Sequence, residues 1–183
     1  MRLTLVRHPK PDVAPGLCYG RTDLAVVPEQ LAHTAAELGA SLAPDATLYS
    51  SPLQRCRDLA VALAAQRGGM APLLDPRLAE MDFGAWEMQP WDAIPRDQID
   101  AWAADPAGYR PGGGETVLEM AARVSAFHAD VQRQQRDAVI ICHAGTMRLL
   151  AACRAGLPLR ETALRAAQHP NAIAYGGTLI LDL

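Results

Sequence analysis

The clearest strand signal in this chain reads Ala138-Val139-Ile140-Ile141-Cys142, and His143-Ala144-Gly145-Thr146 follows it directly. A short run of β-branched and other apolar residues is typical of a strand that is buried on both faces. The small residues after His143 then lead into a helical pattern. A strand that turns at once into a helix is the basic unit of an α/β fold with a mainly parallel sheet.

The same alternation of strands and helices runs along the rest of the chain. The predicted elements are a strand at 2–7, a helix at 28–43, a strand at 47–50, a helix from about 52 to 66, helices near 92–104 and 116–135, and a closing strand at 178–181. We expect Ser51 to cap the second helix, and Thr116 with Glu119 to form a capping box on the long one. We therefore predict one domain over residues 1–183, a three-layer αβα fold whose mostly parallel sheet is flanked by helices, with a small helical insertion around 80–110.

Composition narrows the class of partner. The 183 residues carry a net charge of −3, which argues against a nucleic-acid or membrane-surface binder, because both need a basic face. The four cysteines form no CxxC pair, so we expect reduced thiols and a cytoplasmic protein. No apolar run reaches the length of about 18 residues that spans a bilayer. A small-molecule substrate is the expected partner.

Two histidines follow two predicted strands, His8 after residues 2–7 and His143 after residues 138–142. Ligands of such sheets bind beyond the carboxyl ends of the strands, so the two rings are expected to meet there. Arg7 adds a guanidinium suited to bidentate anion binding. Arg55 lies in the first turn of a predicted helix, where a cation opposes the helix dipole unless an anion is also bound. The pattern predicts an oxyanion site.

A carboxylate and several aromatic residues stand out between these motifs. Glu80 has apolar neighbours, which favour the protonated carboxyl that a general acid needs, and Asp82 and Glu87 compete for this role. Five aromatic residues crowd into positions 83–109, where they form either the core of the insertion or walls for a flat ring: Phe83, Trp86, Trp91, Trp102 and Tyr109.

Together these motifs resemble the histidine phosphatase superfamily, with its phosphoglycerate-mutase-like fold, over nearly the whole chain. The matching segments are Arg7-His8, Gly20-Arg21-Thr22-Asp23-Leu24, Ser51-Pro52-Leu53-x-Arg55, Glu80-x-x-Phe83-Gly84-x-Trp86-Glu87, Pro111-Gly112-Gly113-Gly114-Glu115-Thr116 and His143-Ala144-Gly145. Within the superfamily the chain looks most like the alpha-ribazole phosphatases of cobalamin biosynthesis. The resemblance implies a metal-independent, cofactor-free phosphomonoester hydrolase, either monomer or homodimer, that acts on alpha-ribazole 5'-phosphate.

The resemblance also implies roles for individual residues. His8 is the nucleophile that becomes a phosphohistidine, and Glu80 is the general acid and base. The other phosphate-binding and substrate-binding candidates are Arg7, Arg55, His143, Ala144, Lys10, Tyr19, Arg21 and Trp86. His33, His128 and His169 have no partner spacing and are expected to be structural or surface residues.

Two departures from the family pattern leave alternatives open. Pro9 stands where the family has Gly, which removes a backbone donor, and Ala14 replaces an Asn. Lys10, Tyr19 and Arg21 are candidates to cover these losses. The alternatives are a broad-specificity small-molecule or sugar phosphatase, a mutase, a non-catalytic phosphate-binding protein on this fold, and a metal hydrolase built on His8, Asp12 and His143.

Overall fold

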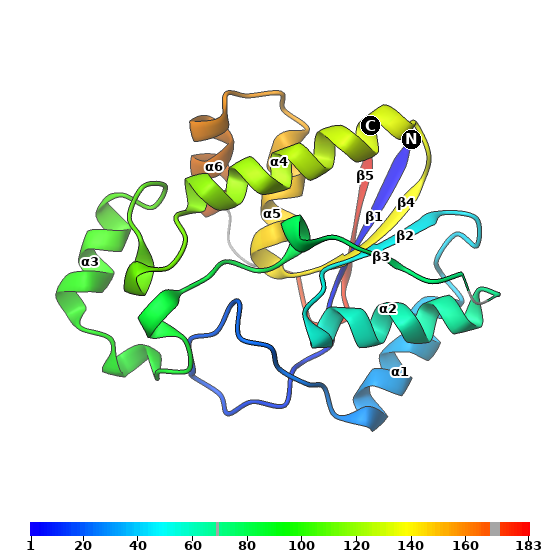
Figure 1. Cartoon of the computed structure of the whole chain (residues 1–183), viewed down its shortest axis with the longest axis horizontal. Helices are drawn as coiled ribbons and strands as arrows, with labels where there is room; N and C mark the ends of the chain where they lie inside the picture. The colour runs from blue at the N-terminus through cyan, green and yellow to red at the C-terminus, as the bar shows by residue number, and fades with distance from the viewer. Residues whose placement is uncertain (69, 169–172) are drawn as a thin grey trace.

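The computed structural model of the protein describes residues 1–68, 70–168 and 173–183. Its described residues form a five-stranded sheet in the order β3-β2-β4-β1-β5 (Figure 1). The strands are β1 (Arg2–Arg7), β2 (Thr47–Ser50), β3 (Leu73–Leu74), β4 (Ala138–Cys142) and β5 (Thr178–Asp182). All neighbouring pairs are parallel except β1 with β5. The register pairs Arg7 with Cys142, so β1 and β4 end side by side.

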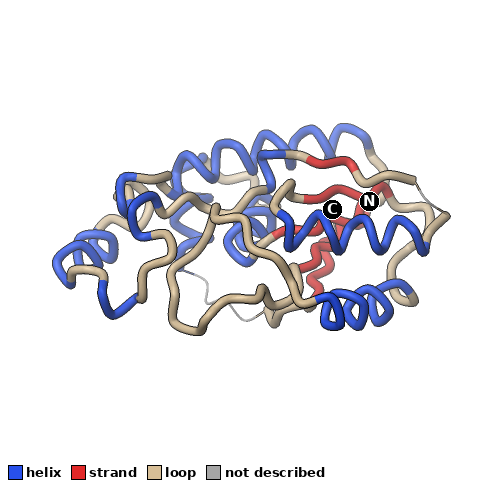
Figure 2. Tube along the Cα trace, turned by 60° about the horizontal axis from the view of Figure 1, so that its bottom comes forward, coloured by secondary structure: helices blue, strands red, loops and turns tan. Residues whose placement is uncertain are grey.

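Helices cover both faces of this sheet, as Figure 2 shows. One face carries α1 (Pro28–Gly39) and α2 (Gln54–Gln66), and the other carries α4 (Val117–Gln134), α5 (Ala144–Cys153) and α6 (Leu159–Gln168). Successive side chains of a strand point to opposite faces. Val139 and Ile141 therefore pack with α1 and α2, whereas Ile140 packs with the other three helices. Both faces of β4 are buried, and the predicted three-layer αβα fold is confirmed.

The predicted boundaries hold best where an element is buried. β1, β2 and β4 have the predicted bounds, and Thr116 and Glu119 form the predicted capping box. The helix predicted at 28–43 ends at Gly39. The short strand β3 and the helix α6 were not predicted.

The prediction for the start of α2 was wrong. The helix begins at Gln54 with Leu53 as N-cap, so Ser51 does not cap it. The Ser51 hydroxyl lies 2.8 Å from Nε2 of His143 and accepts from the N–H of Leu53 at 3.3 Å, and the backbone N–H of Ser51 donates to the carbonyl oxygen of Ile141 in β4. Ser51 therefore belongs to the sheet edge and to the site beside it.

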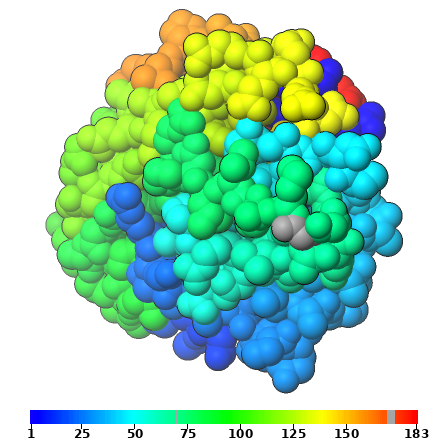
Figure 3. Space-filling model, turned by 45° about the vertical axis from the view of Figure 1, so that its right-hand side comes forward, coloured from blue at the N-terminus to red at the C-terminus, as the bar shows by residue number. Residues whose placement is uncertain are grey.

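The insertion consists of short 3-10 turns and one helix, α3 (Arg96–Ala104), and lies to one side of the sheet in Figure 1. Its small core contains Cys18, Trp86 and Ile94, with Phe83, Ile99, Trp102 and Tyr109 packed around them. Figure 3 shows the N-terminal loop, in blue, on the surface between this insertion and α2. Among the described residues, no helix combines the length and the apolar character that crossing a bilayer requires.

Candidate active site

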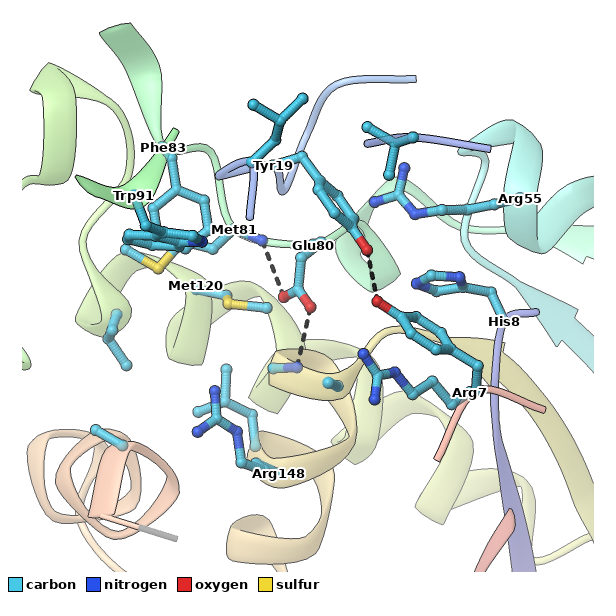
Figure 4. A pocket seen from close by; sticks show the side chains of 18 of the residues that line it. Arg7, His8, Tyr19, Arg55, Glu80, Met81, Phe83, Trp91, Met120 and Arg148 are labelled. Atoms are coloured by element: carbon cyan, nitrogen blue, oxygen red, sulfur yellow. Dashed lines mark hydrogen bonds between the residues drawn. The ribbon is translucent and has the colours of Figure 1, made fainter. Parts of the chain in front are cut away.

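A cavity of about 620 Å³ opens beyond the carboxyl end of β1 and beside the first turn of α5. Figure 4 shows its two ends. Arg7, His8 and Arg55 lie at one end, and an apolar wall that includes Phe83 and Trp91 lies at the other. A pocket of this volume suits a small molecule rather than a macromolecule. Its walls combine a cationic end with an aromatic end.

His8 lies at the charged end, where it is 3% exposed. Its Nδ1 is 2.7 Å from the carbonyl oxygen of Pro9. Because a carbonyl oxygen only accepts, Nδ1 must carry the hydrogen, and Nε2 keeps its lone pair. Burial, followed by the charges of Arg55 and Arg7, lowers the pKa of His8 to about 3, although the bond to Pro9 opposes the shift. The ring is therefore neutral at neutral pH, with a nucleophilic nitrogen.

His143 is the N-cap residue of α5 and is fully buried. Its ring centroid lies 5.0 Å from that of His8, so the two strand-end histidines meet as predicted. Burial, with the charges of Arg55 and His8, lowers the pKa of His143 well below its usual value. His143 itself does not line the cavity wall.

Two guanidinium groups flank His8. Arg55 is fully buried and donates to the carbonyl oxygens of Gly20 at 2.5 Å and Thr22 at 2.8 Å. Arg7 donates to the carbonyl oxygen of Ile173 at 2.6 Å. The Nε atoms of both arginines are buried without a hydrogen-bond partner.

Within the described ranges, no carboxylate lies at ion-pair distance from Arg7 or Arg55. Burying a charge is costly unless an opposite charge compensates it. A buried cation, Arg55, and a partly buried one, Arg7, beside a neutral imidazole are therefore the signature of a site that receives an anion.

Glu80 lines the cavity between its two ends. Its carboxylate accepts hydrogen bonds from the backbone N–H of Met81 at 3.1 Å and of Gly145 at 3.0 Å. A Cβ on Gly145 would lie 2.4 Å from Oε1 of Glu80, so the absence of a side chain there admits the carboxylate. The first turn of α5 thus holds Glu80 beside the site.

The two competing carboxylates do not line the cavity. Glu87 accepts from the N–H groups of Gly20, Arg21, Thr22 and Phe83 and from the Thr22 hydroxyl. Burial alone would raise the pKa of Glu87, but these hydrogen bonds together lower it.

Asp82 accepts from the N–H of Gly84 at 2.8 Å and lies 3.7 Å from Nη1 of Arg21. Of the three carboxylates, Glu80 alone reaches the cavity.

Two of the predicted substrate contacts lie elsewhere. Arg21 is largely exposed and turns toward Asp82, outside the cavity. Trp86 is buried in the core of the insertion, where its indole N–H donates to Gln98 at 2.8 Å. Trp91 and Trp102 line the cavity in its place. The insertion core holds Trp86, and a surface ion pair holds Arg21, away from the cavity lining.

The remaining predicted contacts, Lys10, Tyr19 and Ala144, do line the cavity, and their roles stay predictions. The lining residues that were not predicted include two with polar side chains, Tyr175 and Arg148. Arg148 follows Gly145 by three residues on α5, so helical spacing from the motif was a usable signal. Tyr175 precedes Gly176-Gly177, which signals only a turn.

His33 and His128 do not join the site. His33 is exposed and lies 3.3 Å from Glu37, and His128 is buried in α4 outside the cavity lining. His169 lies outside the described residues. In the part of the chain that the structure describes, no group of His, Cys, Asp and Glu side chains is arranged to hold a metal ion. The metal-hydrolase alternative on His8, Asp12 and His143 therefore has no ligand cluster there.

Comparison with known proteins decides the family. The sequence profile of the histidine phosphatase superfamily (branch 1) matches residues 3–174. The chain belongs to the histidine phosphatase superfamily. The superfamily accounts for the αβα fold and indicates phosphatase chemistry.

This chain is similar to several known proteins. A protein of Mycobacterium tuberculosis, named as a bifunctional protein, is 33% identical over 150 residues, which are 79% of this chain. The chain spans only 38% of the length of that relative.

Two of the proteins are known from their structures. The alpha-ribazole phosphatase of Shigella flexneri is 26% identical, with a TM-score of 0.82, covering 100% of this chain and 91% of that one. A mycobacterial glucosyl-3-phosphoglycerate phosphatase in complex with VO3 is 29% identical, with a TM-score of 0.71, covering 89% and 86%.

Proposed function

We propose that this histidine phosphatase hydrolyses a phosphomonoester through a phosphohistidine on Nε2 of His8. One observation carries the proposal. A neutral imidazole, oriented by the Pro9 carbonyl, lies between one buried and one partly buried guanidinium group, and neither has a carboxylate partner among the described residues. The guanidinium groups of Arg7 and Arg55 neutralise the phosphoryl oxygens while His8 attacks phosphorus.

The reaction proceeds in two steps. In the first, Nε2 forms a bond to phosphorus, the ester P–O bond breaks, and the Glu80 carboxyl gives its proton to the leaving oxygen. In the second, the Glu80 carboxylate takes a proton from water, whose oxygen attacks phosphorus as the P–N bond breaks. Phosphate leaves, and His8 is neutral again. The N-terminus of α5, where His143 is the N-cap and Ala144 offers its backbone N–H, adds positive potential from the helix dipole, and the scheme requires neither metal nor cofactor.

Alpha-ribazole 5'-phosphate is the proposed substrate. The likeness to the Shigella enzyme supports it, as does the order of chemistry along the cavity. The charged end suits a phosphate, and the walls that include Trp91 and Trp102 suit a flat heteroaromatic ring. The likeness to the mycobacterial glucosyl-3-phosphoglycerate phosphatase favours a second candidate, a phosphatase or mutase with a broader or sugar-phosphate specificity. A cytoplasmic monomer or homodimer is part of the same proposal.

The nucleophile is tested with His8→Ala on p-nitrophenyl phosphate. Loss of covalent catalysis should lower kcat by roughly three orders of magnitude or more. His33→Ala is the control, because that histidine is exposed and outside the cavity. Rapid quenching of the wild type should trap one acid-labile phosphoryl group per chain. Unchanged turnover in His8→Ala would show that His8 is not the nucleophile. A stable phosphoprotein without turnover in the wild type would instead indicate a non-catalytic phosphate-binding protein.

The general acid and the substrate need separate tests. Glu80→Gln should slow alkyl phosphates far more than p-nitrophenyl phosphate, because nitrophenolate leaves without a proton. A panel of phosphomonoesters that includes alpha-ribazole 5'-phosphate, run with and without a chelator, tests specificity and metal independence. A sugar phosphate that exceeds alpha-ribazole phosphate in kcat/KM would favour the second candidate.

A further inference from the structure

Two tyrosines from opposite ends of the chain meet in the cavity. The hydroxyl oxygens of Tyr19 and Tyr175 are 2.6 Å apart and hydrogen-bonded. Both residues line the cavity, and Figure 4 shows Tyr19 beside the guanidinium group of Arg55. The phenol pair therefore belongs to the charged end and not to the aromatic wall.

Each ring also packs against the charged residues. The ring centroid of Tyr175 lies 3.9 Å from Cζ of Arg7 and 5.5 Å from the ring of His8. The ring of Tyr19 lies 5.8 Å from Cζ of Arg55. An aromatic face attracts a guanidinium, so Tyr175 restrains Arg7 where it flanks His8.

The backbone fixes Tyr175 to the nucleophile. The N–H of Gly176 lies within 3.2 Å of the carbonyl oxygens of both Arg7 and His8, and the N–H of Arg7 donates to Gly177. Gly176 has a φ of +73°, a conformation that strains any other residue. The turn that carries Tyr175 is thus hydrogen-bonded to the end of β1.

The hydrogen bond between the phenols leaves one donor free. A phenol has one O–H, so one tyrosine donates to the other, and the second O–H is available to the cavity. Burial, and then the bond to Tyr175, raise the pKa of Tyr19, so Tyr19 keeps its proton at neutral pH. Two nearby positions supply no hydrogen-bond donor to a phosphoryl group in this way. Pro9 has no backbone N–H, and the side chain of Ala14, which lines the cavity, carries no donor.

We propose that Tyr19 and Tyr175 form one phosphate-binding unit, which donates a single O–H to the phosphoryl group, and that Tyr175 positions Arg7. This inference rests on the proposed phosphatase function. Tyr175 keeps Arg7 in place by stacking, while the mutual hydrogen bond orients the free O–H toward the oxyanion site.

A double-mutant cycle tests the unit with Tyr19→Phe, Tyr175→Phe and the combined variant, measuring vanadate affinity by calorimetry and KM and kcat on p-nitrophenyl phosphate. Each single variant should weaken vanadate binding about tenfold, as expected for a hydrogen bond to a charged group. The combined variant should bind vanadate no more weakly than the weaker-binding single variant, because either change disrupts the same O–H donor. Tyr109→Phe, in the insertion core and outside the lining, should change nothing.

Other outcomes decide against the unit. If the single variants bound vanadate within twofold of the wild-type affinity, the proposed O–H donor would be ruled out. If the two losses of affinity multiplied in the combined variant, the two tyrosines would act independently. Tyr175→Leu, with its fold checked by thermal unfolding, should lower kcat further than Tyr175→Phe, because it also removes the ring over Arg7; an equal loss would remove the positioning role. A wild type that binds vanadate but does not turn over would refute the proposed function alone, since the affinity cycle still tests the pair.

Discussion

A loop of three residues fixes the most buried cation of the site. The carbonyl oxygens of Gly20 and Thr22 accept from Arg55, and the N–H groups of residues 20–22 donate to Glu87 on the other side of the loop. Glu87 does not touch the cavity. It therefore orients Arg55 through the backbone, although its position next to the acid motif made it a rival acid.

Glu87→Gln tests this positioning role. A side-chain amide would turn N–H groups toward the backbone donors of the loop, so we expect Arg55 to lose its support. KM for p-nitrophenyl phosphate should rise about tenfold, and the free energy of unfolding should fall by about 1–3 kcal/mol. Steady-state kinetics and urea denaturation measure the two effects.

Asp82→Asn is the matched control, because Asp82 is a neighbouring carboxylate outside the cavity that accepts from the N–H of Gly84, whereas the N–H groups of residues 20–22 donate to Glu87. It should leave KM nearly unchanged. If Glu87→Gln slowed alkyl phosphates selectively at constant KM, Glu87 would be an acid after all.

The helix α5 links the end of the sheet to the acid. Its N-cap is His143, and the N–H of Gly145 in its first turn donates to Glu80. The same few residues thus place one histidine against His8 and hold the carboxylate at the cavity. Contact between α5 and Glu80 depends on the missing side chain at position 145.

Gly145→Ala should separate activity from stability. The new Cβ would lie 2.4 Å from Oε1 of Glu80, and the flexible carboxylate would move away. Turnover of alkyl phosphates should fall about tenfold, with a smaller effect on p-nitrophenyl phosphate. Thermal stability should hold or rise, because alanine is favoured over glycine in a helix.

Gly108→Ala is a matched control for this effect. Its Cβ would also lie 2.4 Å from a carboxylate oxygen, that of Asp105, but in the insertion and outside the cavity lining. We expect its kinetics to match wild type. Equal slowing of both classes of substrate in Gly145→Ala would indicate a general distortion of the site.

At the scale of the whole molecule, the fold keeps two imidazoles neutral by burying them together. The pKa of His8 is lowered to about 3 and that of His143 well below its usual value, in both cases chiefly by burial. The unfolded chain takes up protons on both rings as the pH falls through about 6.5, whereas the native state does not. The contribution of these two rings to the free energy of unfolding is therefore fully present above about pH 6.5 and is lost as the pH falls below that value.

This linkage predicts that the free energy of unfolding decreases as the pH falls from 6.5 to 5, and urea denaturation can measure the slope. Each histidine should contribute up to about 1.4 kcal/mol of unfolding free energy per pH unit. His8→Gln should reduce the slope of the wild type by about that amount, and His33→Gln, at an exposed position, should not. An unchanged slope in His8→Gln would mean that the native state protonates His8 readily.

Local sequence was sufficient for the buried elements. β4 was predicted to the residue because five apolar side chains, buried on both faces, leave no other element that suits them. The start of α2 was mispredicted because Ser51 is drawn toward His143, which is distant in sequence. β3 has only two residues, which is too short for any periodic signal.

The chemistry of the site followed from sequence wherever a motif sits at the end of a strand, since sheet topology alone brings His8 and His143 together. The orientation of side chains in loops depends instead on the residues they pack against. Trp86 turned into the insertion core, Arg21 turned to Asp82, and Tyr175 reached Tyr19 across 156 positions. Residue type and spacing determined which groups this protein can bring to a phosphate. Only the tertiary structure decided which of them face it, because that choice depends on long-range contacts that no local pattern encodes.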